Sequence, residues 1–289
     1  MGSSVASPFS LWSSCSNATR ANGAMKTIYV ERNQKAKLCF RIPEFYRSSQ
    51  SRRRLQSKLK SIDFEERKSP NEVKKEIELC YQLINRLGRG VVYLGSSRLG
   101  PSHPHYTQAF ELGKDIANLL NCTSWSGAGP GLMDAVTKGA LEAGKPVGGF
   151  KIGKEAGEWT ATNFHPYLPS GSYLTCRFFS ARKHGLVDAA VRATSLDKTA
   201  VVALPGGIGT LDEAFEILAL IQLGRIGSVL PVPFLLMNYH SFYSKLLELV
   251  EDLEGWGTVS DGEMASMWKV CDTNSEALAY LAEFYGLNQ

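Results

Sequence analysis

Residues 199–213 read Thr-Ala-Val-Val-Ala-Leu-Pro-Gly-Gly-Ile-Gly-Thr-Leu-Asp-Glu, and this stretch decides the fold. The apolar run at 199–204 predicts a buried strand. Gly206, Gly207 and Gly209 follow it, and because they carry no Cβ the backbone can turn sharply and approach a ligand closely. A strand, a glycine turn and a helix start in this order predict an α/β protein in which free amide groups face an anion.

The residues after the glycine turn admit two interpretations. Asp212 and Glu213 fall just inside the predicted helix, where the helix dipole favours ionised carboxylates. Thr210 and Glu213 also have the spacing of a capping box, in which both side chains serve only to satisfy the helix start. From spacing alone, Glu213 is therefore either a structural cap or a charged group beside an anion site.

Helices and strands alternate along the rest of the chain. A capping box at Ser69-Pro70-Asn71-Glu72 predicts the start of a helix that runs to about Gly88. The apolar periodicity predicts strands at 91–94, 123–126, 146–152, 199–204 and 232–237. It predicts helices around 110–120, 132–141, 177–190, 210 onward and 241–253, and a last strand and helix near 267 and 277. Residues 153–176 read as irregular, a functional loop or an insertion. This order predicts a mostly parallel sheet with helices on both faces, and ligands at the carboxyl ends of its strands.

Three turns rich in glycine or serine fall at such strand ends, near residues 95, 127 and 206. The loop at 127 is not a dinucleotide fingerprint, which would need glycine where the sequence has Leu132, and the loop at 206 has no Walker lysine. Each could be a structural turn, but together they favour a bound phosphate. No organic cofactor is expected.

The charge is divided unevenly along the chain. Residues 1–60 contain twelve Lys or Arg and two acids, whereas the remaining residues contain 20 basic and 26 acidic side chains. The first thirty residues are rich in serine and free of acids, which is typical of an organelle transit segment, with a plastid expected first and a mitochondrion second. A plain tail in a cytosolic protein, or nucleic-acid contact through Arg52–Arg54, are the alternatives. Residues 61–289 are expected to form one domain with an N-terminal helix.

Cysteine and histidine spacing gives no sign of a metal. The six cysteines contain no C-x-x-C pair, and the five histidines contain no H-E-x-x-H motif, so a reducing compartment and no metal site are expected. No run of 18 apolar residues occurs, and no membrane contact is expected.

Three segments together resemble a known family. Ser126-Gly-Ala-Gly-Pro-Gly-Leu-Met133, then Arg182-Lys183, then the glycine segment ending at Glu213 are similar in order and spacing to the LONELY GUY proteins, long labelled lysine decarboxylases. The resemblance covers about residues 88–285. It implies a Rossmann-like, doubly wound homodimer that hydrolyses the N-glycosidic bond of a nucleoside 5′-monophosphate to free base and ribose 5-phosphate. Decarboxylation is not expected, because no S-x-H-K segment offers a lysine to pyridoxal phosphate.

The resemblance also implies roles for individual residues. It makes Arg182 and Glu213 the catalytic pair, without a metal or cofactor. It assigns substrate and phosphate binding to Ser96, Gly129, Gly131, Met133, Lys183, Gly206, Gly207, Ile208, Gly209, Thr210 and Asp212. A nucleotide-binding or carrier protein without hydrolysis is the alternative function.

The sequence departs from the family at two of these segments. Ala128 stands where glycine is usual, and Asp212 where members that activate cytokinins have Glu. Asn163-Phe-His-Pro-Tyr167 and Phe178-Phe179 look closer to a longer relative that acts on general purine and pyrimidine nucleotides, so the base is left open. Trp159, Phe178 and Phe179 are either base-stacking residues or core aromatics.

Overall fold

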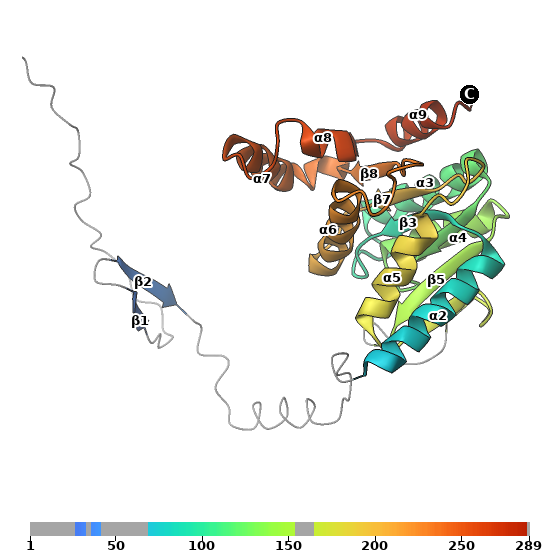
Figure 1. Cartoon of the computed structure of the whole chain (residues 1–289), viewed down its shortest axis with the longest axis horizontal. Coiled ribbons are helices and arrows are strands. Elements are labelled where there is room, and N and C mark those ends of the chain that lie inside the picture. Colours follow the sequence, from blue (N-terminus) through green and yellow to red (C-terminus); the bar gives the residue numbers. More distant parts are fainter. Residues whose placement is uncertain (1–26, 33–35, 42–68, 154–164, 288–289) are drawn as a thin grey trace, which may run out of the picture. The chain divides into compact units, whose positions relative to one another are not determined.

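The computed structural model describes residues 27–32, 36–41, 69–153 and 165–287. The chain divides into two units, residues 1–63 and 64–289. In the first unit, β1 (Thr27–Arg32) and β2 (Ala36–Arg41) form an antiparallel pair (Figure 1). Arg52–Arg54 lie outside the described residues, so targeting and nucleic-acid contact stay predictions.

The second unit is built on a seven-stranded sheet in which every neighbouring pair of strands is parallel, as the alternation of elements predicts. Its strand order is β6-β5-β4-β3-β7-β8-β9. The strands are β3 (Gly90–Leu94), β4 (Thr123–Ser126), β5 (Val147–Ile152), β6 (Tyr173–Cys176), β7 (Ala200–Ala203), β8 (Phe234–Met237) and β9 (Lys269–Cys271).

One strand lies where the sequence predicts irregular structure. β6 pairs with the edge of β5, with Gly149 opposite Tyr173. It is four residues long and only its last residue, Cys176, is fully buried. A strand this short and half-exposed lacks the continuous apolar run that marks the central strands, so periodicity does not reveal it.

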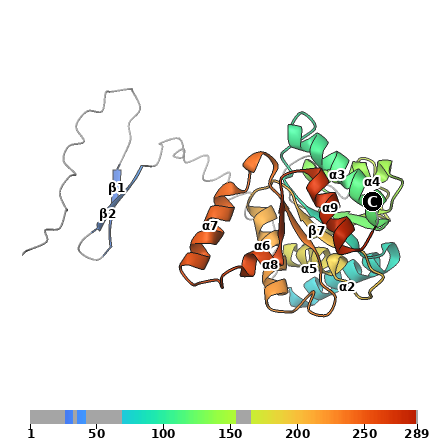
Figure 2. The ribbon, with the colours of Figure 1, turned by 90° about the horizontal axis from the view of Figure 1, so that it is seen from above.

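Helices cover both faces of the sheet, which confirms the doubly wound α/β prediction (Figures 1 and 2). The helices are α2 (Pro70–Leu87), α3 (Pro104–Leu120), α4 (Leu132–Glu142), α5 (Phe179–Ala190), α6 (Ile208–Gln222), α7 (Ser244–Gly255), α8 (Glu263–Met267) and α9 (Asn274–Phe284), with a 3₁₀ turn, η4, at Tyr239–Ser241. Helices α2, α5 and α6 pack on one face, and α3, α4 and α9 on the other. None of the helices in the described part is long and apolar enough to cross a membrane.

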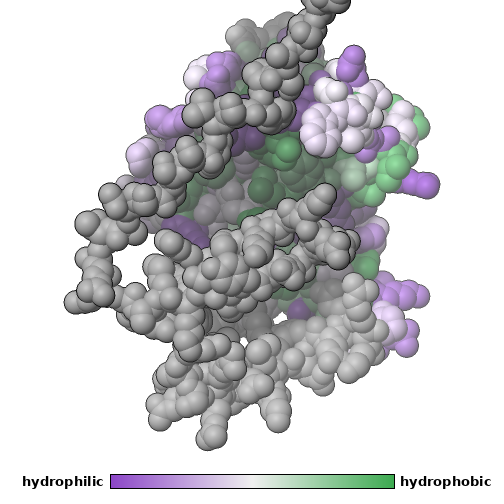
Figure 3. Space-filling model, turned by 90° about the vertical axis from the view of Figure 1, so that its left-hand side faces the viewer, coloured by the Kyte–Doolittle hydropathy of each residue, from purple (hydrophilic) through white to green (hydrophobic). Residues whose placement is uncertain are grey.

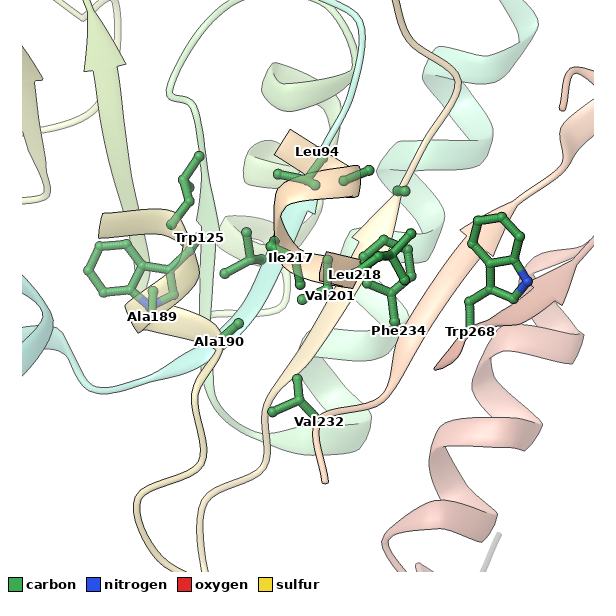
Figure 4. Packing of buried hydrophobic residues seen from close by; sticks show 14 of the residues in the cluster. Leu94, Trp125, Ala189, Ala190, Val201, Ile217, Leu218, Val232, Phe234 and Trp268 are labelled. Atoms are coloured by element: carbon green, nitrogen blue, oxygen red, sulfur yellow. The ribbon is translucent and has the colours of Figure 1, made fainter. Parts of the chain in front are cut away.

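The two cores use alternate residues of the same strands. Val92 and Leu94 of β3 face α2, α5 and α6, whereas Val91 and Tyr93 face α3 and α4. Figure 4 shows the first core, where Ile217 and Leu218 of α6 approach the strand residues. Burial of both faces explains why these strands read as continuous apolar runs.

The predicted capping box of α2 is wrong. Ser69 is the N-cap, but its side chain makes no capping hydrogen bond. Glu72 instead forms an ion pair with Arg177, in the segment that leads into α5. The first turn of α2 therefore uses its carboxylate for a tertiary contact, which spacing within one helix cannot reveal.

Candidate active site

The site lies where the order of strands reverses. From the central strand β3 the chain continues through β4, β5 and β6 on one side, then crosses back to β7 on the other side. The loops after β3 and β7 meet at the carboxyl edge, where the Ser96 amide donates to the Pro205 carbonyl oxygen over 3.1 Å. Open α/β sheets bind ligands at such switch points.

A cavity of about 520 Å³ opens at this point. It lies among the loop after β3, the start of α4, the first turns of α5 and the start of α6. Its described lining residues are Gly95, Ser96, Ser97, Arg98, Met133, Phe179, Arg182, Gly207, Ile208, Gly209, Thr210 and Glu213. The structure therefore brings most of the sequence-predicted site residues to one place.

A buried ion pair forms one wall of the cavity. Arg182 Nη1 of α5 lies 2.6 Å from Glu213 Oε1 of α6, and both residues are at most 6% exposed. Arg182 Nε also donates to the Phe150 carbonyl oxygen over 2.9 Å. A carboxylate in contact with a guanidinium is stabilised in its ionised form. The arginine thus holds Glu213 charged and in a fixed orientation at the edge of the cavity.

Gly127 makes room for this arginine, a role the sequence prediction did not assign. A Cβ on Gly127 would lie 2.1 Å from Arg182 Nη2 and 2.7 Å from Met133 Sδ. Any side chain here would displace the guanidinium that pairs with Glu213. The glycine-rich character of the loop was the available signal, but only the contact identifies which glycine supports the ion pair.

Helix α6 begins three residues earlier than a cap at Thr210 would require. Its N-cap is Gly207, in an extended conformation and without a side-chain cap. The capping-box interpretation of Thr210 and Glu213 is therefore wrong: Glu213 lies in the second helical turn and pairs with Arg182 instead. The amide groups of the first turn receive no side-chain cap and border the cavity.

The three glycines of the turn differ in what they contact. A Cβ on Gly206 would lie 2.1 Å from Thr210 Oγ1, so packing explains this glycine. A Cβ on Gly207 or Gly209 would meet nothing within 4 Å, and neither residue has a positive φ. Neither packing nor backbone conformation within the described residues explains these two glycines, both of which line the cavity. Their missing side chains keep open the space that a ligand would occupy.

Gly131, in the loop after β4, packs against the loop after β3. Gly131 has φ +75°, and a Cβ there would lie 2.3 Å from the Ser96 carbonyl oxygen, which accepts from the Leu132 amide. Gly129 is buried in the same loop and does not line the cavity. Gly131 supports the loop that carries Ser96, and Met133 is the residue of this segment that reaches the cavity.

Ala128, the departure from the family pattern, adopts a backbone conformation that favours glycine. Its φ is +48°, and its amide donates to Ser126 Oγ over 3.1 Å. A Cβ on the neighbouring Gly149 would lie 2.6 Å from the Ala128 methyl group, so Gly149 provides the space for that methyl group. The alanine is thus accommodated in the buried loop without altering the cavity wall.

Lys183 and Asp212 form an ion pair beside the cavity instead of lining it. Lys183 Nζ lies 3.0 Å from Asp212 Oδ2 and 2.9 Å from Glu216 Oε2. Burial alone would lower the pKa of Lys183, but the hydrogen bonds to Glu216 and Asp212 raise it overall. The pair joins α5 to α6 next to the buried pair, and substrate contact by either residue stays a prediction.

The aromatic residues fall into different environments. Phe178 is buried in the protein, as the core interpretation expects, whereas Phe179 lines the cavity with its ring 5.5 Å from the Arg182 guanidinium carbon. Trp159 lies outside the described residues. Stacking on a base therefore remains a prediction for Phe179 and Trp159.

A second buried polar group adjoins Met133, and no sequence motif predicts it. Asp134 accepts hydrogen bonds from Tyr106 Oη at 2.5 Å and Tyr167 Oη at 2.6 Å, and it pairs with Lys138 at 2.9 Å. These contacts fix the first turn of α4 against α3 and the segment after residue 164. Within the described ranges no three His, Cys, Asp or Glu side chains come together as metal ligands.

Known proteins match this chain at the level of a family. The family model "Possible lysine decarboxylase" matches residues 133–281. A "Probable cytokinin riboside 5'-monophosphate phosphoribohydrolase LOGL6" of Oryza sativa subsp. japonica is 27% identical over 61% of this chain and 63% of its own length. A "Probable cytokinin riboside 5'-monophosphate phosphoribohydrolase LOG4" of the same organism is 28% identical over 69% of this chain and 80% of its own. The chain thus spans less than two thirds of the first relative.

Among solved structures, a molybdenum cofactor carrier protein from Chlamydomonas reinhardtii overlaps 69% of this chain and 99% of its own chain, with 18% identity and a TM-score of 0.44. The family model extends from the start of α4 into α9 and includes Met133, the Arg182–Glu213 pair and the glycine turn. The chain therefore belongs to the LONELY GUY family, whose model carries the description "Possible lysine decarboxylase".

Proposed function

We propose that the protein hydrolyses the N-glycosidic bond of a nucleoside 5′-monophosphate, releasing the base and ribose 5-phosphate. The observation that carries this proposal is the buried Arg182–Glu213 pair, which borders the same cavity as the open, glycine-rich start of α6. The names of the rice relatives, which describe phosphoribohydrolases, support the same reaction.

Each part of the cavity has a task in this reaction. The amide groups at the start of α6 bind the phosphate, and Gly207 and Gly209 let it approach the backbone. Departure of the base places positive charge on the ribose. Glu213, held ionised by Arg182, stabilises that charge or orients the attacking water. Arg182 acts mainly through Glu213, because one of its nitrogens already binds the carboxylate and another binds the Phe150 carbonyl oxygen.

Apolar side chains provide a surface for the base. Phe179, Met133 and Ile208 line the cavity, and Ile208 is 83% exposed. Stacking and apolar contact of this kind tolerate different bases. The proposal therefore includes cytokinin ribotides and general purine or pyrimidine nucleotides as substrates.

A homodimer is part of the proposal. Figure 3 views the side on which α7 and α6 lie and shows hydrophobic residues gathered between hydrophilic ones. Three apolar residues are exposed along α6 and at its end: Ile208 at the start, Phe215 in the middle at 40% and Leu223 after the last turn at 67%. Exposed apolar surface of this kind is typical of a protein interface. Because Ile208 belongs to both the cavity and this apolar surface, a partner subunit would lie close to the bound nucleotide.

The test is release of base by the purified full chain. AMP, other nucleoside monophosphates and isopentenyladenosine monophosphate are incubated with the protein, and free base is separated by liquid chromatography. We expect base from at least one nucleotide and none with Glu213→Gln. Saturable nucleotide binding without release of base from any substrate would contradict the hydrolase and support a nucleotide carrier on the same fold.

We further propose that residues 1–60 direct the protein to plastids and that residues 61–289 form the catalytic domain. The serine-rich, acid-free composition of the first thirty residues supports this assignment. Residues 1–60 fused to a fluorescent protein should accumulate in plastids. Mitochondrial or cytosolic fluorescence would contradict the plastid assignment.

A further inference from the structure

We propose that Arg98 is the side chain that neutralises the phosphate of the substrate, a role distinct from that of Arg182. This inference rests on the proposed function, because it names the residue that recognises the phosphate of the nucleotide. Arg98 follows β3 and lines the cavity, and neither the family resemblance nor the motifs of the sequence single it out.

The charges of the cavity leave Arg98 unbalanced. The described lining residues with formal charge are Arg98, Arg182 and Glu213. Arg182 and Glu213 pair with each other at 2.6 Å, so their charges compensate. No ion pair involves Arg98 within the described part of the chain, and its side chain is exposed. Among the described lining residues, Arg98 therefore supplies the one positive charge that no described acidic side chain pairs with.

The fold places Arg98 beside the start of α6. β3 and β7 are neighbours in the sheet, with Leu94 opposite Ala203, and the loops that follow them are joined by the hydrogen bond from Ser96 to Pro205. Arg98 thus extends from the loop adjacent to the glycine turn. A phosphate at the first turn of α6 would lie between helix amides on one side and this guanidinium on the other. A phosphate ester carries about 1.5 to 2 negative charges at neutral pH, which the partial charge of a helix start alone does not compensate.

The loop that carries Arg98 is held firmly at its base. The Arg98 amide donates to Ser96 Oγ over 3.1 Å, and the Ser96 carbonyl oxygen accepts from the Leu132 amide over 2.9 Å. Gly131 packs so closely against Ser96 and Ser97 that a Cβ would overlap their backbone. A guanidinium on a fixed loop can form two parallel hydrogen bonds to a phosphate at a small cost in conformational entropy.

The experiment compares binding of AMP and ribose 5-phosphate to the full chain by calorimetry, together with the KM and kcat for AMP. Charge-assisted hydrogen bonds of this kind predict that Arg98→Gln raises the Kd for both ligands and the KM for AMP by about 10- to 100-fold. We expect kcat to change by less than about threefold, because binding alone is lost. Arg98→Lys, which keeps the charge, should recover part of the affinity.

The matched control is Lys75→Gln, which removes an exposed positive charge on α2 that does not line the cavity and should leave both ligands unaffected. A Kd for AMP within threefold of wild type in Arg98→Gln would overturn the proposal. Loss of AMP binding in Arg98→Gln with ribose 5-phosphate binding intact would also overturn it, because Arg98 would then contact the nucleobase. Failure of the wild type to bind either ligand would overturn it as well. If Arg98→Gln loses affinity for both ligands and the wild type releases no base, the role of Arg98 in phosphate binding is supported and the proposed hydrolysis is overturned.

Discussion

At the scale of single residues, the site depends on one buried ion pair whose members lie 31 positions apart in the sequence. Burying two charges costs solvation free energy, which their mutual attraction offsets only when the geometry is good. Here Arg182 and Glu213 are 2.6 Å apart, and the Phe150 carbonyl oxygen satisfies a further donor of the arginine. Removing one partner should therefore be more harmful than removing both.

We expect Arg182→Met to lower the free energy of unfolding by about 3–5 kcal/mol, because the buried carboxylate of Glu213 loses the guanidinium beside it. The double variant Arg182→Met/Glu213→Gln should recover at least about 1 kcal/mol of that loss. Urea unfolding measures both. The control is Lys183→Met on the same helix, where the partner Asp212 is 45% exposed, and the cost should stay below about 1 kcal/mol. Equal losses in Arg182→Met and Lys183→Met would contradict this account of the pair.

His165 should make the stability of the protein depend on pH. Burial lowers the pKa of His165 to about 4, with Lys151 and Lys138 acting in the same direction and Asp134 opposing them. The unfolded chain has the ordinary pKa of 6.5 and therefore binds the proton more tightly. The stabilisation is complete above pH 6.5 and is lost as the pH falls towards 4, amounting to at most about 3 kcal/mol.

Thermal unfolding between pH 7 and pH 4 measures this effect. His165→Gln should flatten the dependence, whereas His184→Gln, which changes an exposed histidine, should leave it as in the wild type. An unchanged pH profile in His165→Gln would show that another group is responsible.

At the scale of elements, the start of α6 separates glycines needed for folding from glycines that leave space for a ligand. Gly206 lies against Thr210, whereas Gly209, in the first helical turn, has open space where a Cβ would be. The two glycines are three positions apart and should respond to the same substitution in opposite ways.

Gly209→Ala should stabilise the protein by about 0.5–1 kcal/mol, since alanine loses less conformational entropy than glycine in a helix. The same methyl group should weaken AMP binding by at least about tenfold, because it occupies space next to the phosphate. Gly206→Ala should instead destabilise the protein by about 1–3 kcal/mol through overlap with Thr210. Thermal unfolding and calorimetry on both variants check this. Undiminished AMP affinity in Gly209→Ala would mean that the phosphate does not bind at the start of α6.

At the scale of the whole molecule, the sheet topology brings the loops after β3, β4 and β7 to one edge, and an apolar surface around α6 adjoins the resulting cavity. The cavity and the proposed dimer interface share Ile208. Assembly and substrate binding should therefore be linked.

We expect the wild type to sediment as a dimer and Leu223→Glu to sediment as a monomer, because a charge at the interface core would be left unpaired and desolvated. Leu79→Glu on α2, another exposed leucine, is the matched control and should remain dimeric. Sedimentation velocity at several protein concentrations distinguishes the forms. A monomeric wild type would contradict the homodimer, and a dimeric Leu223→Glu would place its interface elsewhere.

Much of this protein follows from the sequence alone. Apolar runs bounded by glycine predict the central strands, the alternation of elements predicts a parallel doubly wound sheet, and the motifs ending at Met133, Lys183 and Glu213 predict the family. These signals are readable because they depend on residues close together in the chain. The short edge strand β6 is not predicted in this way, because half-exposed residues in a four-residue strand leave little periodic signal.

Only the tertiary structure decided what individual residues of the site do. Glu213 has the spacing of a helix cap, yet Arg182 reaches it from another helix, and Gly127 matters because that arginine passes over it. Lys183 and Asp212 share the predicted motifs but pair beside the cavity, whereas Arg98 belongs to no motif and faces into it. The reason is physical: hydrogen bonds, ion pairs and steric contact act over a few ångströms in space, and distance along the chain does not specify which side chains the fold brings that close.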